Sequence, residues 1–393
     1  MRVTGIRHIA VPLAGAVSNA MVSFERHTVS LLVILTDQVR HGRPVYGAAF
    51  NSIGRFDQSG ILSTRIVPRV IGADPESLLH EDGVGLDPAS VRRVAMTDEK
   101  PGGHGDRASA IAAVELAAWD LNAKLADEPA YATIARAHGR PVPHDPGVPT
   151  YAAGGYYCDA DTVDEQRALL VSELKRYRAA GYTSFKIKIG GAPMEIDLAR
   201  VEAAIEIAGD AANVAVDANG RFAVEDGARW AKALAPYGLR WLEEPCDPLD
   251  FETLRAVAAA FGGPVATGEN LFSRQDVVNL LRYAGLRQDR DVLQMDAGLS
   301  YGLTEYAGMV AAMEDFGMSR TQAVPHGGHL VNLHIVAGLG LGACESYPGV
   351  FAPFGGYGTA PVTAGLIDAT DAPGFGLEQK ADLAAHLDRL TTA

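Results

Sequence analysis

The sequence predicts an α/β protein in which a parallel barrel of alternating strands and helices follows an α+β N-terminal domain. After residue 145, short apolar runs alternate with helical stretches at a regular interval, a pattern typical of parallel β/α architectures. About eight such units in roughly 200 residues favour a closed barrel. The competing fold, a doubly wound open sheet, would usually carry a glycine-rich phosphate turn after its first strand. No such turn follows the first apolar run of this region.

The first 145 residues combine strand-like and helical segments. IRHIAVPL, SLLVILTD and PVYGAAF favour strands. Residues 108–126, ASAIAAVELAAWDLNAKLA, are rich in Ala and Leu and carry a lengthwise apolar face, which predicts a helix. Four prolines in GRPVPHDPGVPT then mark a linker. We therefore expect a separate α+β domain over residues 1–145.

The barrel is expected over residues 146–350. Its strand candidates are TYAAGG, SFKIKI, VAVDA, RWLEE, VATGE, VLQMD, TQAVPH and CESY. Helical stretches such as EIDLARVEAAIEIAG lie between most of them. The remaining segment, 351–393, is rich in Gly and Pro before it becomes weakly helical, and we expect it to pack back on the N-terminal domain.

The charge balance limits the partners of the chain. Thirty-four basic residues stand against 48 acidic ones, a net charge of −14, which argues against nucleic acid because no basic patch is available to neutralise phosphates. No apolar run approaches the roughly 18 residues that a membrane helix requires. The chain is expected to bind a small molecule, without nucleic acid or membrane.

The cysteines and the N-terminal segment indicate a cytoplasmic protein. The three cysteines are widely spaced and odd in number, which favours a reducing compartment over a disulfide framework; they are Cys158, Cys246 and Cys344. The first 20 residues superficially resemble a signal peptide. However, His8 and Pro12 interrupt the apolar stretch, and its alternation favours a strand.

Three carboxylates follow neighbouring strand candidates at equal spacing. Asp217, Glu243 and Glu269 stand 26 residues apart, and each closes a short apolar run. A step of this size fits one strand plus one helix, so the three acids should meet at the C-terminal ends of adjacent strands. Converging carboxylates repel one another unless a cation binds them. All-oxygen ligands favour Mg²⁺, with Mn²⁺ as a substitute, over Zn²⁺. Asn219 and Glu244 are adjacent polar candidates for supporting the site or contacting the substrate.

Two lysines lie on one strand of the expected barrel. Lys186 and Lys188 alternate with Phe185, Ile187 and Ile189, so both ammonium groups should point into the barrel. The alternative, an exposed edge strand with solvated lysines, is disfavoured by the apolar neighbours. Two ammonium groups near each other and near a metal should lower each other's pKa, and a partly neutral lysine can act as a base.

A histidine and an aspartate end the next pair of strands. His326 follows TQAVP and Asp296 ends VLQMD, so the carboxylate could orient the imidazole as an acid or base. His329 and His334 extend the run to HGGHLVNLH, which could suggest zinc, but the carboxylates make a zinc site redundant. Glu345, on the last strand, could hydrogen-bond the substrate.

Together these residues suit one class of reaction. A metal binds a substrate carboxylate, a base removes the adjacent α-proton, and the metal stabilises the resulting enediolate.

The motifs resemble the enolase superfamily, in its mandelate racemase group. The resemblance covers almost the whole chain and rests on KIK, VDANG, WLEEP, TGEN, a strand-end Asp, PHGGH and a final-strand Glu. Longer segments resemble the D-tartrate dehydratases within that group, namely TDEKPGGHGDR, YAAGGYY, KIGGAP, ATGENLFS, QDRDVLQMDAGLSYGL and ACESYPGVFAPFGGY. The resemblance implies a (β/α)7β TIM-like barrel, a capping domain completed by the C-terminal segment, and a homo-oligomer.

The resemblance also implies roles for individual residues. Metal ligation would come from the three carboxylates named above. Lys188 would be the base at the carbon beside one carboxylate, and His326, held by Asp296, would protonate the departing hydroxyl to give oxaloacetate. Which of Lys188 and His326 removes the α-proton stays open. The implied contacts to a hydroxy-diacid substrate are Lys186 and Glu345 and, from the capping domain, Asn19 and Lys100.

Two alternatives remain. Another acid-sugar dehydratase or a racemase could use the same machinery on this scaffold, with only pocket shape and the capping domain to separate them. A non-catalytic binding protein could also keep the barrel, although it would have no physical need for so many costly buried charges.

Overall fold

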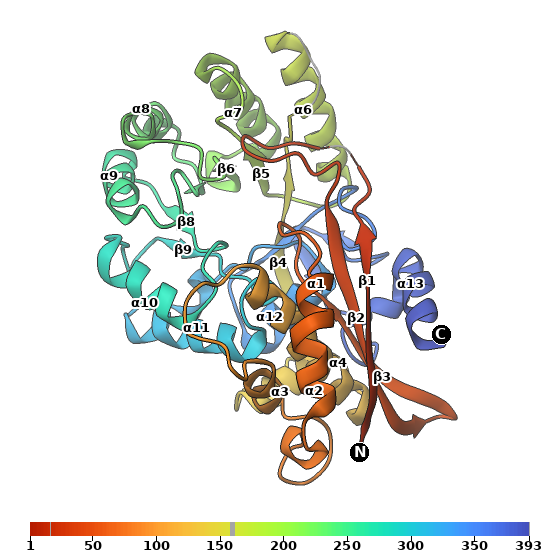
Figure 1. Ribbon diagram of the computed structural model, residues 1–393. Helices are drawn as coiled ribbons and strands as arrows, with labels where there is room; N and C mark the ends of the chain where they lie inside the picture. The colour runs from red at the N-terminus through yellow and green to blue at the C-terminus, as the bar shows by residue number, and fades with distance from the viewer. Residues whose placement is uncertain (16, 158–161, 393) are drawn as a thin grey trace.

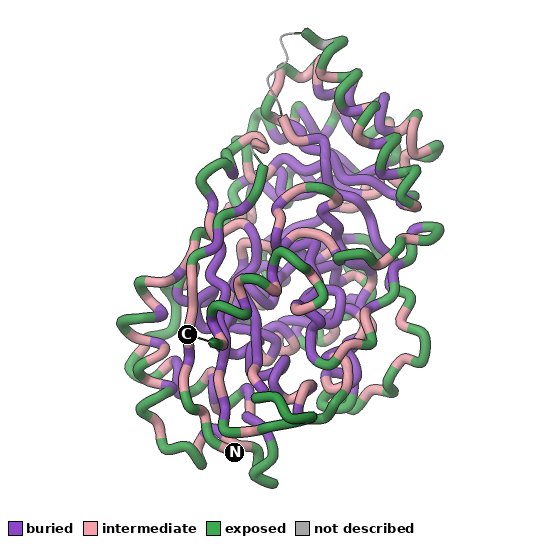
Figure 2. Tube along the Cα trace, turned by 90° about the vertical axis from the view of Figure 1, so that its right-hand side faces the viewer, coloured by how far each residue is buried: buried purple, intermediate pink, exposed green. Residues whose placement is uncertain are grey.

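The computed structural model describes residues 1–15, 17–157 and 162–392 of the chain. A barrel of strands ringed by helices packs against an antiparallel sheet with its own helices (Figure 1). The buried residues run through both parts, while the exposed ones lie mainly on the outer helices and loops (Figure 2). The predicted α/β fold with a parallel barrel is confirmed.

The N-terminal sheet is an antiparallel meander in the order β1-β2-β3. Its strands are β1 Val3–Pro12, β2 Thr28–Arg40 and β3 Arg43–Phe50. The helical elements that follow are α1 Ser59–Ile61, a π-helical turn Leu62–Ile66, α2 Val67–Gly72, a 3-10 turn Pro75–Leu78, α3 Pro88–Ala95, α4 Asp106–Ala126 and α5 Ala130–Ala137. The three sequence segments predicted as strands all fall in this sheet.

Helix α4 is buried on nearly every side. The helix was predicted from the sequence, but with only one apolar face. In the structure its Ala-rich surface allows neighbours to approach closely on all sides. At Gly47 of β3, an added Cβ would lie 2.0 Å from the Ala117 carbonyl oxygen, so only glycine permits this sheet-to-helix contact.

The barrel strands pair in parallel and in chain order from β4 to β9, and β10 closes the ring against β4. They are β4 Gly147–Gly154, β5 Phe185–Lys188, β6 Val214–Asp217, β7 Trp241–Glu243, β8 Val265–Thr267, β9 Val292–Leu293 and β10 Cys344–Ser346. Between β9 and β10, Ala323 contributes a single bridge to Leu293. Closure excludes the open doubly wound sheet.

Helices surround the barrel and connect its strands (Figure 1). They are α6 Val163–Ala179, α7 Met194–Ala208, α8 Val224–Leu234, α9 Phe251–Phe261, α10 Arg274–Tyr283, α11 Leu303–Asp315 and α12 Leu330–Leu339, with short 3-10 turns at Ala211–Asn213, Ala235–Tyr237 and Arg320–Gln322. None of the described helices has the length and apolar character needed to span a bilayer.

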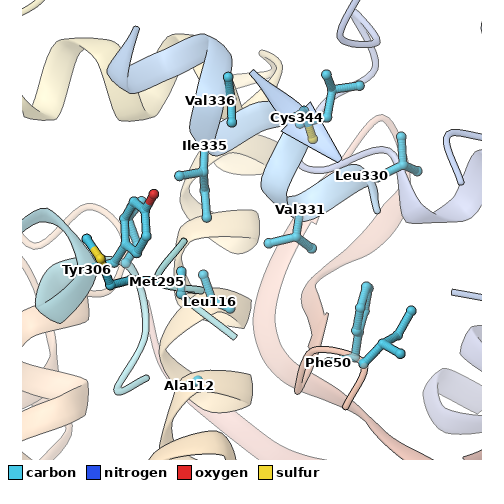
Figure 3. Close-up of a cluster of buried hydrophobic side chains, with 14 of the residues drawn as sticks. Phe50, Ala112, Leu116, Met295, Tyr306, Leu330, Val331, Ile335, Val336 and Cys344 are labelled. Carbon is cyan, nitrogen blue, oxygen red and sulfur yellow. The ribbon is translucent and has the colours of Figure 1, made fainter. Parts of the chain in front are cut away.

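A shared apolar core joins the N-terminal part to the barrel. Leu116 of α4 lies in one cluster with Tyr306 of α11, Met295 after β9, and the apolar side chains of α12 (Figure 3). Phe50 at the end of β3 belongs to the same core. Burial of this apolar surface fixes the N-terminal part over the barrel.

The C-terminal segment contacts both parts of the molecule. Strands β11 Val362–Thr363 and β12 Leu366–Asp368 form a hairpin, and β12 pairs antiparallel with the start of β4. After a 3-10 turn, Leu377–Gln379, helix α13 Ala381–Thr392 packs on β1 and β2. The division of the chain at residues 145 and 350 stays a prediction. Cys246 and Cys344 are buried free thiols, and Cys158 lies outside the described residues.

Candidate active site

Strand pairing brings the predicted charged residues to one end of the barrel. Lys188 of β5 pairs with Asp217 of β6, which pairs with Glu243 of β7. Glu269 follows β8 by two residues. Below this layer, the barrel is filled by side chains including Tyr151, Trp241 and Ala266. Alternation along the strands therefore sets a charged layer directly above an apolar one.

Lys186 lies among three carboxylates. Its Nζ donates to Glu243, is 2.7 Å from Glu345 Oε1, and lies 3.5 Å from Asp217 Oδ2. Burial alone would lower the pKa of Lys186, but Glu243 and Glu345 outweigh it and hold the pKa well above its ordinary value. In the chain itself, the carboxylate neighbours of Lys186 therefore dominate over the second ammonium group. The lowering of the two lysine pKa values beside a metal stays a prediction.

Lys188 reaches the cavity and pairs with Asp217. Its Nζ donates to Asp217 Oδ2 at 2.5 Å and lies 5.3 Å from the centre of the Tyr156 ring. Burial would raise the pKa of Asp217, but Lys188 and Lys186 hold it well below its ordinary value. Asn219 completes this corner, with its backbone N–H 2.9 Å from Asp217 Oδ1.

The predicted ligands have a donor set that suits a hard cation, but they are not preassembled. Among the described residues, no three His, Cys, Asp or Glu side chains are grouped so that they could hold a metal ion. Asp217 and Glu243 instead bond to the two lysines. All the proposed ligand atoms are carboxylate oxygens from adjacent strand ends, as Mg²⁺ prefers. Asn219 Oδ1 is also buried without a hydrogen-bond partner in the described chain, so the residues fit a cation that brings further polar ligands.

His326 and Asp296 form the predicted pair. The imidazole Nδ1 lies 3.1 Å from Asp296 Oδ2, and Nε2 lies 3.8 Å from Glu269 Oε2. Burial would lower the pKa of His326, but Glu269, the Asp296 hydrogen bond and Glu345 raise it to about 9.

Glu345 supports the site from the floor and does not line the cavity. Its Oε2 accepts from the Gly327 N–H at 2.9 Å and from the Tyr347 hydroxyl at 3.0 Å. The Tyr347 oxygen also lies 3.3 Å from His326 Nε2. Sequence reasoning missed Tyr347, although its place two residues after Glu345 would have put both side chains on the same face.

A cavity of about 440 Å³ opens above these residues, between the barrel and the N-terminal part. Lys188, His326, Glu269 and Asn219 line it from the barrel. Of the two predicted capping contacts, Asn19 lines the cavity, whereas Lys100 is exposed and is not among the described lining residues.

The neighbour of Lys100 explains why this lysine faces away. Glu99 accepts hydrogen bonds from Arg65, Arg69 and Arg107, which fixes the loop with Glu99 inward and Lys100 toward solvent. Arg55 and Asn270, by contrast, line the cavity. No sequence signal singled out Arg55, because only the loop conformation aims it at the cavity.

The other histidines of HGGHLVNLH have structural roles. His329 precedes α12, and its Nδ1 accepts from the Asn332 N–H while its Nε2 contacts Ser52. His334 is buried, stacks on Tyr131 and accepts from its backbone N–H. The two rings therefore serve separate neighbours.

Comparison with known proteins identifies the family. Residues 169–383 match the family described as "Enolase C-terminal domain-like". The chain belongs to the enolase superfamily, in its mandelate racemase group. The resemblance predicted from the motifs is therefore confirmed at the level of the family.

Similar proteins include enzymes that act on sugar acids. The chain is 31% identical to 3,6-anhydro-alpha-L-galactonate cycloisomerase of Streptomyces coelicolor over 287 residues, covering 70% of each chain. It is 26% identical to L-talarate/galactarate dehydratase of Salmonella typhimurium, covering 84% of this chain and 77% of that one. A solved racemase from Streptomyces coelicolor A3(2) with bound magnesium superposes with a TM-score of 0.75 at 25% identity, covering 99% of both chains.

Proposed function

We propose that the protein is a Mg²⁺-dependent acid-sugar dehydratase that converts D-tartrate to oxaloacetate. The observation that carries this proposal is the pairing of Lys188 with Asp217 and of His326 with Asp296 around one cavity. An amine and a carboxylate-held imidazole supply the base and the acid that loss of water from adjacent carbons requires.

The relatives support this class of reaction and this metal. One of them is an L-talarate/galactarate dehydratase, and a racemase of similar structure contains magnesium. In this chain, Asp217, Glu243 and Glu269 would hold the Mg²⁺. When bound, the ion supplies positive charge that stabilises the negative charge developing on a substrate carboxylate.

Lys188 would take the proton from the carbon next to that carboxylate. Its Nζ lines the cavity beside Asp217, so the ammonium formed in the step has a charge partner within hydrogen-bonding distance. Lys186 lies deeper in the floor, where it balances Glu243 and Glu345. Its role would be to hold the carboxylate layer together and to stabilise charge on the substrate.

His326 would give its proton to the hydroxyl that leaves the neighbouring carbon. Its Nδ1 is committed to Asp296, so Nε2, which lies 3.3 Å from the Tyr347 hydroxyl oxygen, is the ring nitrogen that would reach a ligand in the cavity. Loss of one α-proton and one hydroxyl from tartrate removes water and leaves the enol of oxaloacetate. The enol then tautomerises to the keto acid without any other reactant.

A substrate screen tests this proposal. Purified protein with Mg²⁺ should be incubated with the three stereoisomers of tartrate and with galactarate, talarate, galactonate and arabinonate, and the α-keto acid measured. D-Tartrate should give oxaloacetate. If only another sugar acid gave a keto acid, the assignment as a dehydratase would stand and D-tartrate would be replaced as the substrate. Racemisation in deuterated water with no keto acid from any substrate would overturn the dehydratase in favour of a racemase.

A further inference from the structure

Arg55 lines the cavity from the N-terminal part. It lies in the loop after β3 and is half-buried. One guanidinium nitrogen donates to the Gly54 carbonyl at 2.9 Å, and another donates to Asn270 Oδ1. The guanidinium carbon lies 5.4 Å from the centre of the Phe272 ring. These contacts hold the side chain at the cavity and leave N–H donors for a ligand, since guanidinium carries five.

The charge of Arg55 has no carboxylate partner among the described residues. The described chain contains no ion pair to this guanidinium, whereas Lys188 in the same cavity is paired with Asp217. A partly desolvated arginine of this kind gains most from a planar anion that can accept two parallel hydrogen bonds. A carboxylate has this shape, and one delivered by the substrate would supply the missing charge.

Asn270 fixes the orientation of the neighbouring acceptor. Its Nδ2 donates to both oxygens of Glu244, at 2.9 Å and 3.0 Å. These two hydrogen bonds orient the Asn270 amide so that its Oδ1 faces Arg55. Arg55 is therefore held by neutral oxygens of Gly54 and Asn270, and its net positive charge remains available in the cavity.

We propose that Arg55 binds the second carboxylate of the substrate, so that the site selects diacids over monoacids with the same hydroxyl pattern. The inference rests on the proposed function and deepens it, because it assigns recognition of the remote end to Arg55. Asn270 acts as a positioning residue for it. The reacting carboxylate and its neighbouring carbon would lie at Lys188 and His326, on the barrel side of the same cavity.

Matched substrate pairs test the proposal. D-Tartrate and D-threonate differ only in that one carboxylate is a hydroxymethyl group, and galactarate and galactonate form a second such pair. Arg55→Met should lower kcat/KM for the diacid by about tenfold to a hundredfold, mainly through KM, because a charge-assisted hydrogen-bond pair is lost. Turnover of the monoacid should change by less than about threefold. Arg55→Lys should restore part of the diacid preference because it keeps the charge.

Arg43→Met is the matched control, since Arg43 is an exposed arginine of the same N-terminal sheet and does not line the cavity. It should leave the ratio of diacid to monoacid turnover unchanged. Thermal melting of each variant separates misfolding from altered recognition. A wild-type enzyme that processes threonate as well as tartrate, or an Arg55→Met variant that loses both substrates equally, would overturn the proposal while leaving the dehydratase assignment intact.

Binding provides a readout that does not depend on turnover. Calorimetry with Mg²⁺ in a Lys188→Met background should show that D-tartrate binds more tightly than D-threonate, and that adding Arg55→Met removes the difference. If the wild-type enzyme dehydrates no acid, the proposed function fails and these binding data still decide the role of Arg55. The proposed role of Arg55 would be overturned if D-tartrate and D-threonate bound equally tightly, or if D-tartrate did not bind.

Discussion

Asp296 holds the imidazole of His326 in place. Its Oδ2 lies 3.1 Å from Nδ1, while its Oδ1 accepts the backbone N–H of Gly298 at 2.8 Å. The carboxylate is fully buried and also fixed by its own backbone neighbour, so it can rotate little. This arrangement keeps a proton on Nδ1 and leaves Nε2 for the cavity.

Replacing Asp296 with Asn should separate proton abstraction from loss of water. Asn can donate to Nδ1 and so stabilise the wrong tautomer, and it no longer supports the imidazolium. Dehydration should fall by about 10²-fold to 10⁴-fold. Exchange of the α-hydrogen in deuterated water should persist, because Lys188 is unaffected. Proton NMR of D-tartrate with the variant and Mg²⁺ measures both processes.

Lys188→Met is the reciprocal variant and should abolish the exchange along with dehydration. If the Asp296→Asn variant instead lost the exchange and the Lys188→Met variant kept it, the two roles would be reversed, and His326 would be the base.

Removal of magnesium should abolish turnover and lower stability. Chelation with EDTA should stop keto-acid formation, and Mg²⁺ or Mn²⁺ should restore it. Saturating Mg²⁺ should raise the free energy of unfolding by about 2.7 kcal/mol at a concentration of 100 times its Kd.

Glu269→Gln should weaken this dependence of activity and stability on Mg²⁺. Glu252→Gln, which changes an exposed acid of α9, should not. Full activity in EDTA, or an unchanged magnesium dependence in Glu269→Gln, would contradict the proposed ligand set.

The sequence was sufficient to locate the barrel layer of the site because strand geometry is local. Alternation places Lys186 and Lys188 on one face, and the repeated strand-helix spacing places Asp217 beside Glu243. The capping contacts depend instead on loop conformation. Glu99 is tied to arginines distant in the sequence, which turns Lys100 outward. No local pattern encodes such a contact, and for the same reason Arg55 gave no signal.

Lys124 should be more important for stability than its partner at the C-terminal segment. Its Nζ lies 2.6 Å from Asp120 Oδ2 and 2.5 Å from Glu378 Oε1. Asp120 is fully buried and also accepts the N–H groups of Ala48 and Phe375. Lys124→Met would leave that charge unpaired and should cost about 3–5 kcal/mol. Glu378 is 34% exposed, so Glu378→Gln should cost about 1 kcal/mol or less. Urea unfolding measures the loss of stability in both variants. Equal losses would show that the buried Asp120 does not need the Lys124 ammonium group.

His334 should make the protein lose stability as the pH falls below neutrality. Burial against Tyr131 and Phe375 lowers the pKa of His334 from 6.5 to about 3. Well above pH 6.5 the ring is neutral in both states and its pH-dependent contribution is constant. As the pH falls, the unfolded chain binds a proton that the folded chain excludes, which should cost roughly 2–3 kcal/mol of stability by about pH 4.5.

The His334→Asn variant tests this prediction, because asparagine keeps an acceptor for the Tyr131 N–H but cannot titrate. Urea midpoints from pH 7 to about 4.5 should therefore fall less steeply in the variant than in the wild type. Parallel curves, offset by a constant amount, would show that His334 is protonated in the folded protein.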